Sequence, residues 1–380
     1  MKLINLFKKR KPNVILILLD SVRADVLDRM PYFNELKKES VFFDNLIAYA
    51  PYTMGSIHAT FSGMDGNQNG INGYYKLYSF DKNNCFTLTQ YLKEAGYYTE
   101  ADIIEEHVIS SQGFDKVRSY GRSETGLIKR HLEILNQIKA KNPFFLFLDH
   151  DIIHTSMKEL SKGHSDMDKE YYSNKERNLK LYLELVEKNS NYLDAVLEKI
   201  KELKLYDNSL ILIFSDHGCS VGDKIGEFFY GVYLYDYTIR CFLYIIGKDL
   251  PKNVQIHNVV MSVDVLPTIL EILGLKQKTG FKPMQGKSFL PFIYGKLEER
   301  TAYSETGGLG GPTPSPEMHN VQSVRTNKWK LIYNKTTKKK ELYHLEKDSG
   351  ENHNLIGKKK EIDGKLWQEM EKLSRGDYNV

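Results

Sequence analysis

The sequence has few of the features that mark secreted, membrane-spanning or nucleic-acid-binding proteins. Its three cysteines, Cys85, Cys219 and Cys241, are an odd number without paired spacing, which argues against a disulfide framework or a structural zinc site. No run approaches the roughly 18 apolar residues that cross a bilayer. Lys and Arg number 53 against 49 Asp and Glu, and this small excess is spread along the chain, so no basic nucleic-acid footprint is present. We therefore expect a cytoplasmic protein with no nucleic-acid partner and no integral membrane segment.

Two apolar runs end in residues that ligate metals. The run 14–19 stops at Asp20, and the run 210–214 is followed by Ser215, Asp216 and His217. Both runs are typical of buried parallel strands. In open α/β sheets ligands bind outside the carboxyl ends of the strands, so the sequence predicts that Asp20 meets Asp216 and His217 there.

Strand and helix patterns alternate through the first 300 residues, which predicts a large, mainly parallel sheet flanked by helices. The expected helices are 31–39, 88–94, 123–141, 176–203 and 262–274, and the expected strands are 14–19, 41–43, 97–104, 143–148, 210–214 and 242–246. From residue 301 the pattern changes to short strands (322–326, 329–333 and 341–345), which predict a small antiparallel sheet. We expect a catalytic α/β domain over residues 1–300 and a C-terminal subdomain over residues 301–380 that packs on it.

Four segments, in order, resemble the sulfatase-like branch of the alkaline phosphatase superfamily. They are Asp20-Ser21-Val22-Arg23-Ala24-Asp25, the segment 50–63 around Thr53, Ser215-Asp216-His217-Gly218, and residues 341–348. Each match alone is weak evidence for the family. Four matches in the family's order, spread over almost the whole chain, are strong evidence together. The resemblance implies an α/β sulfatase-like fold and an ester hydrolase.

The resemblance implies a role for each matched residue. Thr53 occupies the position of the nucleophile, and Asp20, Thr53, Asp216 and His217 would ligate a divalent cation. True sulfatases carry Cys-x-Pro-Ser-Arg at the Thr53 position and convert the cysteine to formylglycine, which a threonine cannot form. Many also have two consecutive aspartates where this chain has Asp20-Ser21, so we expect a single metal ion, preferably manganese, with magnesium, calcium or zinc as alternatives.

Two further residues are candidate catalytic groups by the same resemblance. His154 matches a His-Thr segment and would bind the substrate oxyanion or protonate the leaving group. Relatives have a second histidine where Tyr230-Gly231-Val232 stands, and Lys224 would compensate by contacting the oxygens of the transferred group. His150 is offset from the family position, so we assign it no role.

A threonine at this position resembles the phosphoglycerol and phosphoethanolamine transferases and related phosphohydrolases of the superfamily. This resemblance implies phosphate-type esters, so we expect a metal-dependent phosphoric ester hydrolase or transferase with Thr53 as its nucleophile. One alternative is a sulfuric ester hydrolase without formylglycine, and another is a non-catalytic binding protein that retains the fold. The substrate would be a small-molecule or glycan-linked phosphate or sulfate ester. Taken singly, Thr53 is better explained as a helix cap, and His154 and Lys224 as a structural and a surface residue; the other motifs reverse this preference for Thr53.

Overall fold

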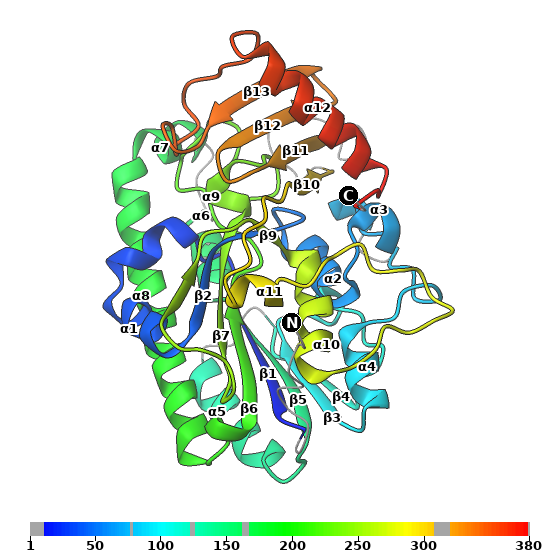
Figure 1. The fold of residues 1–380 in the computed structure, drawn as a ribbon. Coiled ribbons are helices and arrows are strands. Elements are labelled where there is room, and N and C mark those ends of the chain that lie inside the picture. Colours follow the sequence, from blue (N-terminus) through cyan, green and yellow to red (C-terminus); the bar gives the residue numbers. More distant parts are fainter. Residues whose placement is uncertain (1–10, 77–78, 122–125, 162–166, 308–319, 379–380) are drawn as a thin grey trace.

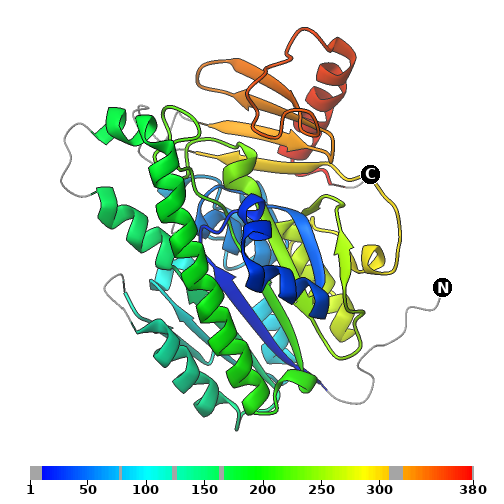
Figure 2. The ribbon, with the colours of Figure 1, turned by 90° about the vertical axis from the view of Figure 1, so that its left-hand side faces the viewer.

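A computed structural model describes residues 11–76, 79–121, 126–161, 167–307 and 320–378. Within them lie a large mixed sheet with helices on both faces and a smaller antiparallel sheet at one end of it (Figures 1 and 2). This is the predicted α/β sulfatase-like architecture. No helix in these ranges is both long and apolar enough to cross a membrane.

The large sheet has the strand order β4-β3-β5-β1-β6-β7-β2-β8, and β9 also pairs with β2. The strands from β4 to β6 run parallel, whereas β7 is antiparallel to both β6 and β2. Their bounds are β1 Asn13–Leu19, β2 Val41–Ile47, β3 Tyr98–Ile103, β4 Lys116–Ser119, β5 Phe144–His150, β6 Ser209–Phe214, β7 Arg240–Ile246, β8 Val254–Ile256 and β9 Val260–Met261.

The central strand β1 is apolar on both sides because both of its faces are covered by helices. Val14, Leu16 and Leu18 pack in one hydrophobic cluster with α2 (Thr53–Ser62), α4 (Leu88–Glu94) and α10 (Val265–Leu273). The alternate residues of the strand pack in a second cluster with α1 (Pro31–Glu39), α5 (Leu127–Ile138), α6 (Ile152–Ser161) and α8 (Lys175–Glu202). Because successive side chains of a strand point to opposite faces of the sheet, β1 contributes to two separate hydrophobic cores.

Short helices complete the main body. They are α3 Gly66–Asn69, α7 Met167–Ser173, α9 Asp236–Ile239 and α11 Leu290–Ile293, with the 3₁₀ turns Ala24–Arg29, Tyr74–Lys76, Glu106–Val108, Tyr206–Asn208 and Ser262–Asp264.

The small sheet has four antiparallel strands in sequence order, β10 Ala302–Thr306, β11 Val321–Arg325, β12 Trp329–Asn334 and β13 Lys339–His344, and α12 (Lys360–Ser374) packs on it. A buried ion cluster joins this sheet to the main body. The ammonium of Lys330 lies 2.8 Å from Asp236 and 2.9 Å from Glu351, and Arg325 also pairs with Asp236. Asp236 begins α9, so the cluster fixes the small sheet to the segment between β6 and β7.

Most predicted elements are confirmed, with ends shifted by a few residues. Part of the predicted helix 123–141 falls outside the described residues, and α5 covers 127–138 of it. The strands β4, β8, β9 and β10 were not predicted, because they are short and sit at sheet edges or beside loops. The division of the chain at residue 300 stays a prediction.

Candidate active site

Asp20, Asp216 and His217 form one buried group, called here the ligand cluster, at the carboxyl ends of two neighbouring parallel strands. Leu18 of β1 pairs with Phe214 of β6. Asp20 and Asp216 each lie two residues after this pair, so they leave the sheet at the same level. Each member of the cluster offers one ligand atom within 4.8 Å of the others. The predicted meeting of these residues across almost two hundred positions is therefore present in the fold.

The donor set of the ligand cluster suits a divalent cation. The Nδ1 atom of His217 lies 2.8 Å from the carbonyl of Gly218, so this nitrogen carries the proton and the lone pair of Nε2 faces Asp20 and Asp216 at 3.5 and 3.6 Å. Oδ2 of Asp216 is buried and accepts no hydrogen bond. Burial raises the pKa of Asp216 to about 7; His217 acts against this increase, and the negative charge of Asp20 adds to it. A cation at this position would compensate two buried carboxylates and occupy both unused lone pairs.

Gly218 keeps the segment after the ligand cluster close to α9. Its N–H donates to the carbonyl of Thr238 at 2.7 Å, and a Cβ at this position would lie 2.1 Å from the carbonyl oxygen of Tyr237. Only glycine therefore fits beside His217 in this arrangement.

Thr53 is the first residue of α2, and its hydroxyl points to the ligand cluster. Oγ1 lies 3.4 Å from Oδ2 of Asp20 and 3.3 Å from Nε2 of His217. The residue that precedes the helix is Tyr52, so the helix-cap interpretation of Thr53 is wrong. Ser56, one turn along α2, donates to the carbonyl of Asp216 at 2.8 Å and so fixes the start of the helix against the end of β6.

His154 lies beside Asp20, near the start of α6. Its Nδ1 is 3.7 Å from Oδ2 of Asp20, and the hydroxyl of Tyr230 lies within 3.0 Å of its ring nitrogens. The ring of Tyr230 also packs against His217, with centroids 4.6 Å apart. Tyr230 thus lies beside both histidines.

A cavity opens beside Thr53 and Asp20, and much of its lining was not predicted. Its walls are formed by Asp20, Tyr52, Thr53, Met54, Tyr74, Ile104, Glu105, His107, Val108, His154 and Tyr230. Glu105 and His107 form an ion pair at 3.1 Å just after the end of β3. Ligands bind outside the carboxyl ends of parallel strands, and β3 is also such a strand. The position of Glu105 and His107 after it could therefore have marked them as site residues, but neither was predicted.

Carboxylates are concentrated around the ligand cluster. Asp149 is the second-last residue of β5, the other neighbour of β1, and its pKa is raised well above the usual range by burial and by the charges of Asp20 and Asp151. Burial also raises the pKa of Asp151, which accepts a hydrogen bond from Tyr120 at 3.2 Å. The local electrostatic field therefore favours positive charge.

His150 points away from this site, in agreement with its lack of an assigned role. Its ring stacks on Tyr192 with centroids 3.8 Å apart, and Nδ1 lies 2.8 Å from Oδ1 of Asn189. Burial lowers its pKa to about 3.

Lys224 is the predicted site residue that the structure does not bring to Thr53. Its ammonium donates to the backbone carbonyl of Glu351 and, at 3.1 Å, to Oδ1 of Asn352, and it lies over the ring of Tyr235. It is not among the described residues that line the cavity. Contact with a transferred group would require another side-chain conformation, so its catalytic role stays a prediction.

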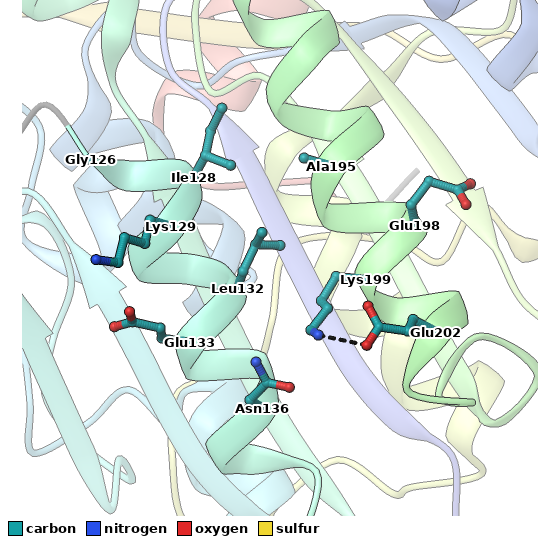
Figure 3. A pocket seen from close by; sticks show the side chains of 10 residues that line it. All are labelled: Gly126, Ile128, Lys129, Leu132, Glu133, Asn136, Ala195, Glu198, Lys199 and Glu202. Atoms are coloured by element: carbon teal, nitrogen blue, oxygen red, sulfur yellow. Dashed lines mark hydrogen bonds and ion pairs between the residues drawn. The ribbon is translucent and has the colours of Figure 1, made fainter.

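A second hollow, between α5 and α8, shares no lining residue with the cavity at Thr53. Figure 3 shows Ile128, Leu132 and Ala195 between the two helices, with the ion pair of Lys199 and Glu202 at 2.8 Å. The described residues that line it include no histidine, cysteine or hydroxyl side chain, so it offers no hydroxyl or thiol nucleophile and no soft metal ligand.

Comparisons with known proteins identify the family. The family model described as "Sulfatase" matches residues 12–275, and the model described as "N-sulphoglucosamine sulphohydrolase, C-terminal" matches residues 226–376. The first match covers more than half of the chain, the ligand cluster and Thr53 included. The chain belongs to the sulfatase family of the alkaline phosphatase superfamily.

Similar curated proteins include arylsulfatase K from two mammals. The bovine protein is 26% identical over 48% of this chain, and the human protein is 22% identical over 96% of it. The matched stretch covers 34% of the bovine protein and 82% of the human one. The chain thus aligns with only about a third of the bovine relative.

Solved structures share the fold at low sequence identity. A 2-O GAG sulfatase superposes with a TM-score of 0.78 at 18% identity, covering 97% of this chain and 93% of the other. A phosphonate monoester hydrolase of Agrobacterium radiobacter superposes with a TM-score of 0.75 at 16% identity, covering 97% and 96%. Both confirm the predicted fold class.

Proposed function

We propose that this protein is a metal-dependent ester hydrolase that cleaves sulfate monoesters at the ligand cluster, with Thr53 as its nucleophile. The observation that carries this proposal is the Thr53 hydroxyl, held between Asp20 and His217 at the start of a helix and beside a buried site suited to a divalent cation. The family assignment supports the reaction type, and the sulfatases among the relatives support the sulfate ester. The comparisons therefore favour the sulfuric ester hydrolase over the phosphate-type hydrolase that the threonine first suggested.

Asp20, Asp216 and His217 would hold the cation, with Thr53 as a further oxygen ligand. When bound, a divalent ion supplies Lewis acidity to the transferred group and lowers the pKa of a nearby hydroxyl. Manganese suits this set of two carboxylates and one imidazole, and magnesium, calcium and zinc are the alternatives.

The remaining steps belong to the protein's own groups. Oγ1 of Thr53 attacks sulfur in line with the leaving alcohol and passes its proton to Asp20, to which it donates a hydrogen bond. An O–S bond to Thr53 forms as the ester O–S bond breaks. His154 donates a proton to the departing alkoxide. Water then attacks the sulfur of the sulfo-threonine and His154 accepts its proton. The bond between sulfur and Oγ1 breaks, Asp20 returns the proton to Oγ1, and hydrogen sulfate is released from the regenerated Thr53.

The cavity wall opposite the ligand cluster would receive the leaving alcohol. Tyr52 and Tyr74 offer aromatic faces, and Glu105 and His107 offer hydrogen-bonding groups. Aromatic rings combined with polar groups suit a sugar, which has both C–H faces and hydroxyls. The substrate proposed is accordingly a sulfated carbohydrate; one solved relative has D-glucosamine-2-N,6-O-disulfate bound as its substrate.

A phosphate-type ester is the second candidate, and the observation that favours it is again Thr53. A sulfo-threonine has no elimination route back to free enzyme, unlike a formylglycine hemiacetal sulfate, so its hydrolysis requires a second in-line attack. Phosphorus esters are cleaved by such two-step displacement at hydroxyl nucleophiles. The solved phosphonate monoester hydrolase has the same fold.

The deciding experiment compares nitrophenyl sulfate, phosphate, phosphodiester and phosphonate esters side by side with the manganese-loaded protein. The proposal expects the highest kcat/KM for the sulfate ester. A higher value for a phosphorus ester would replace it with the second candidate. Turnover of none of these esters or of a sulfated disaccharide, together with tight binding of inorganic sulfate, would instead support a non-catalytic binding protein.

A further inference from the structure

Ser21 adopts an unusual backbone conformation between the two halves of the ligand cluster. Its φ is 65°, in the left-handed region that non-glycine residues seldom adopt, and the residue is fully buried. Strain of this kind persists only where the surrounding structure imposes it, and it concentrates at functional sites.

Each polar group of Ser21 has a defined partner in this conformation. Its hydroxyl donates to Oδ1 of Asp20 at 2.6 Å, a distance typical of a charge-assisted hydrogen bond. Its N–H points to Oδ1 of Asp216 at 3.5 Å, and its carbonyl accepts from the hydroxyl of Tyr182 at 2.8 Å. Tyr182 is itself held by the N–H of Arg23 at 2.7 Å.

We propose that Ser21 is a positioning residue for the cation site, one that acts through Asp20. This inference rests on the proposed metal-dependent function. The Ser21 hydroxyl occupies one lone pair of Oδ1 and so fixes the rotation of the Asp20 carboxylate, leaving Oδ2 toward Thr53 at 3.4 Å. Without this bond the carboxylate would rotate freely between the facing imidazole and threonine. Hydrogen-bond partners of metal ligands commonly contribute about 10- to 100-fold to metal affinity.

Two substitutions separate the hydroxyl from the backbone strain. Ser21→Ala removes the hydroxyl and keeps a Cβ at φ 65°, whereas Ser21→Gly removes the hydroxyl and also relieves the strain. Ser215→Ala is the matched control, because Ser215 is also buried and precedes Asp216, but no hydrogen bond in the described part of the chain joins its Oγ to the ligand cluster.

The experiment titrates manganese(II) chloride into chelator-treated protein by isothermal calorimetry and records the Tm of each metal-free protein. We expect both Ser21 variants to bind manganese about 10- to 100-fold more weakly than wild type. The metal-free Tm of Ser21→Gly should equal or exceed that of wild type, and Ser215→Ala should bind as wild type. Such a result separates lost positioning from lost folding.

Several outcomes would overturn the proposal. Wild-type affinity in Ser21→Gly, with weakened binding only in Ser21→Ala, would assign the effect to the backbone. A manganese-bound crystal structure with the Ser21 hydroxyl at direct coordination distance, about 2.0 to 2.6 Å, would make Ser21 a ligand instead. If wild type itself bound no manganese, the metal-dependent function would fail together with this proposal, whereas failure of the Ser21 proposal alone would appear only in the variants.

Discussion

Oγ1 of Thr53 lies 3.3 Å from Nε2 of His217, although 164 positions separate the two residues in the chain. Nδ1 of His217 is bound to the carbonyl of Gly218, so the nitrogen that faces Thr53 is a lone-pair acceptor. This lone pair is available to ligate a cation beside the Thr53 oxygen. This relationship makes Thr53 the first residue to test.

Replacing Thr53 should abolish turnover without unfolding the protein. We expect Thr53→Ala to lower kcat by at least about 100-fold, because the attacking oxygen is lost, while Thr53→Ser should keep measurable activity. Circular dichroism and Tm should remain close to wild type. The control is Thr60→Ala, on the same helix, where the hydroxyl bonds only to the carbonyl of Ser56.

Mass spectrometry gives a second test of Thr53. After rapid quenching with a slow ester substrate, the peptide that contains Thr53 should carry a sulfuryl or phosphoryl adduct. Wild-type turnover in Thr53→Ala would rule out a threonine nucleophile.

Asp216→Asn should stabilise the metal-free protein while it destroys the cation site. The folded-state pKa of about 7 lies above the ordinary 3.8, so the folded state binds the proton more tightly. The stabilisation that the protonated Asp216 carboxyl gives the folded protein is present at low pH and is lost as the pH rises toward 7. The uncharged amide avoids this loss, so the stability advantage of the variant should grow between pH 4 and 7 and then level off.

Urea unfolding of chelator-treated protein across this pH range measures the effect, with the exposed Asp249→Asn as control. Added manganese should raise the Tm of wild type and leave that of Asp216→Asn nearly unchanged. Equal manganese stabilisation of both proteins would place the ion elsewhere.

His154 should matter most for poor leaving groups. Its ring lies near Asp20 and Tyr230. If it protonates the leaving alcohol, His154→Gln should slow alkyl esters by about 100-fold or more and nitrophenyl esters much less, since nitrophenolate departs without a proton. Equal losses on both ester types would reassign His154 to binding of the transferred group.

His150 should make the protein sensitive to acid. Its folded-state pKa of about 3 lies below the unfolded value of 6.5, so the folded state binds the proton less tightly. Its contribution to stability is present above pH 6.5 and is lost as the pH falls, by about 1.4 kcal/mol per pH unit. The difference in unfolding free energy between wild type and His150→Gln should therefore change with this slope between pH 6.5 and 4.

The control for this measurement is His257→Gln, at a side chain that is 67% exposed. It should leave the pH dependence unchanged. A parallel pH profile for His150→Gln and wild type would show that His150 titrates normally.

The sequence by itself determined the layered α/β architecture. Strands such as β1 and β6 are short apolar runs without charge, and their composition demands burial on both faces. The same runs end in Asp20 and Asp216, and parallel strands bring such ends to one edge of the sheet. The ligand cluster could be predicted for that reason, and the structure assembles it.

Only the tertiary structure decided which other side chains reach the cluster. Tyr230, Glu105 and His107 lie in segments without regular periodicity, so their directions depend on contacts with distant elements. Lys224 lies in the same kind of segment, and its ammonium binds Glu351 and Asn352 instead. Strand composition is a local property that the sequence states directly, whereas the course of a loop is fixed by the surfaces on which it packs.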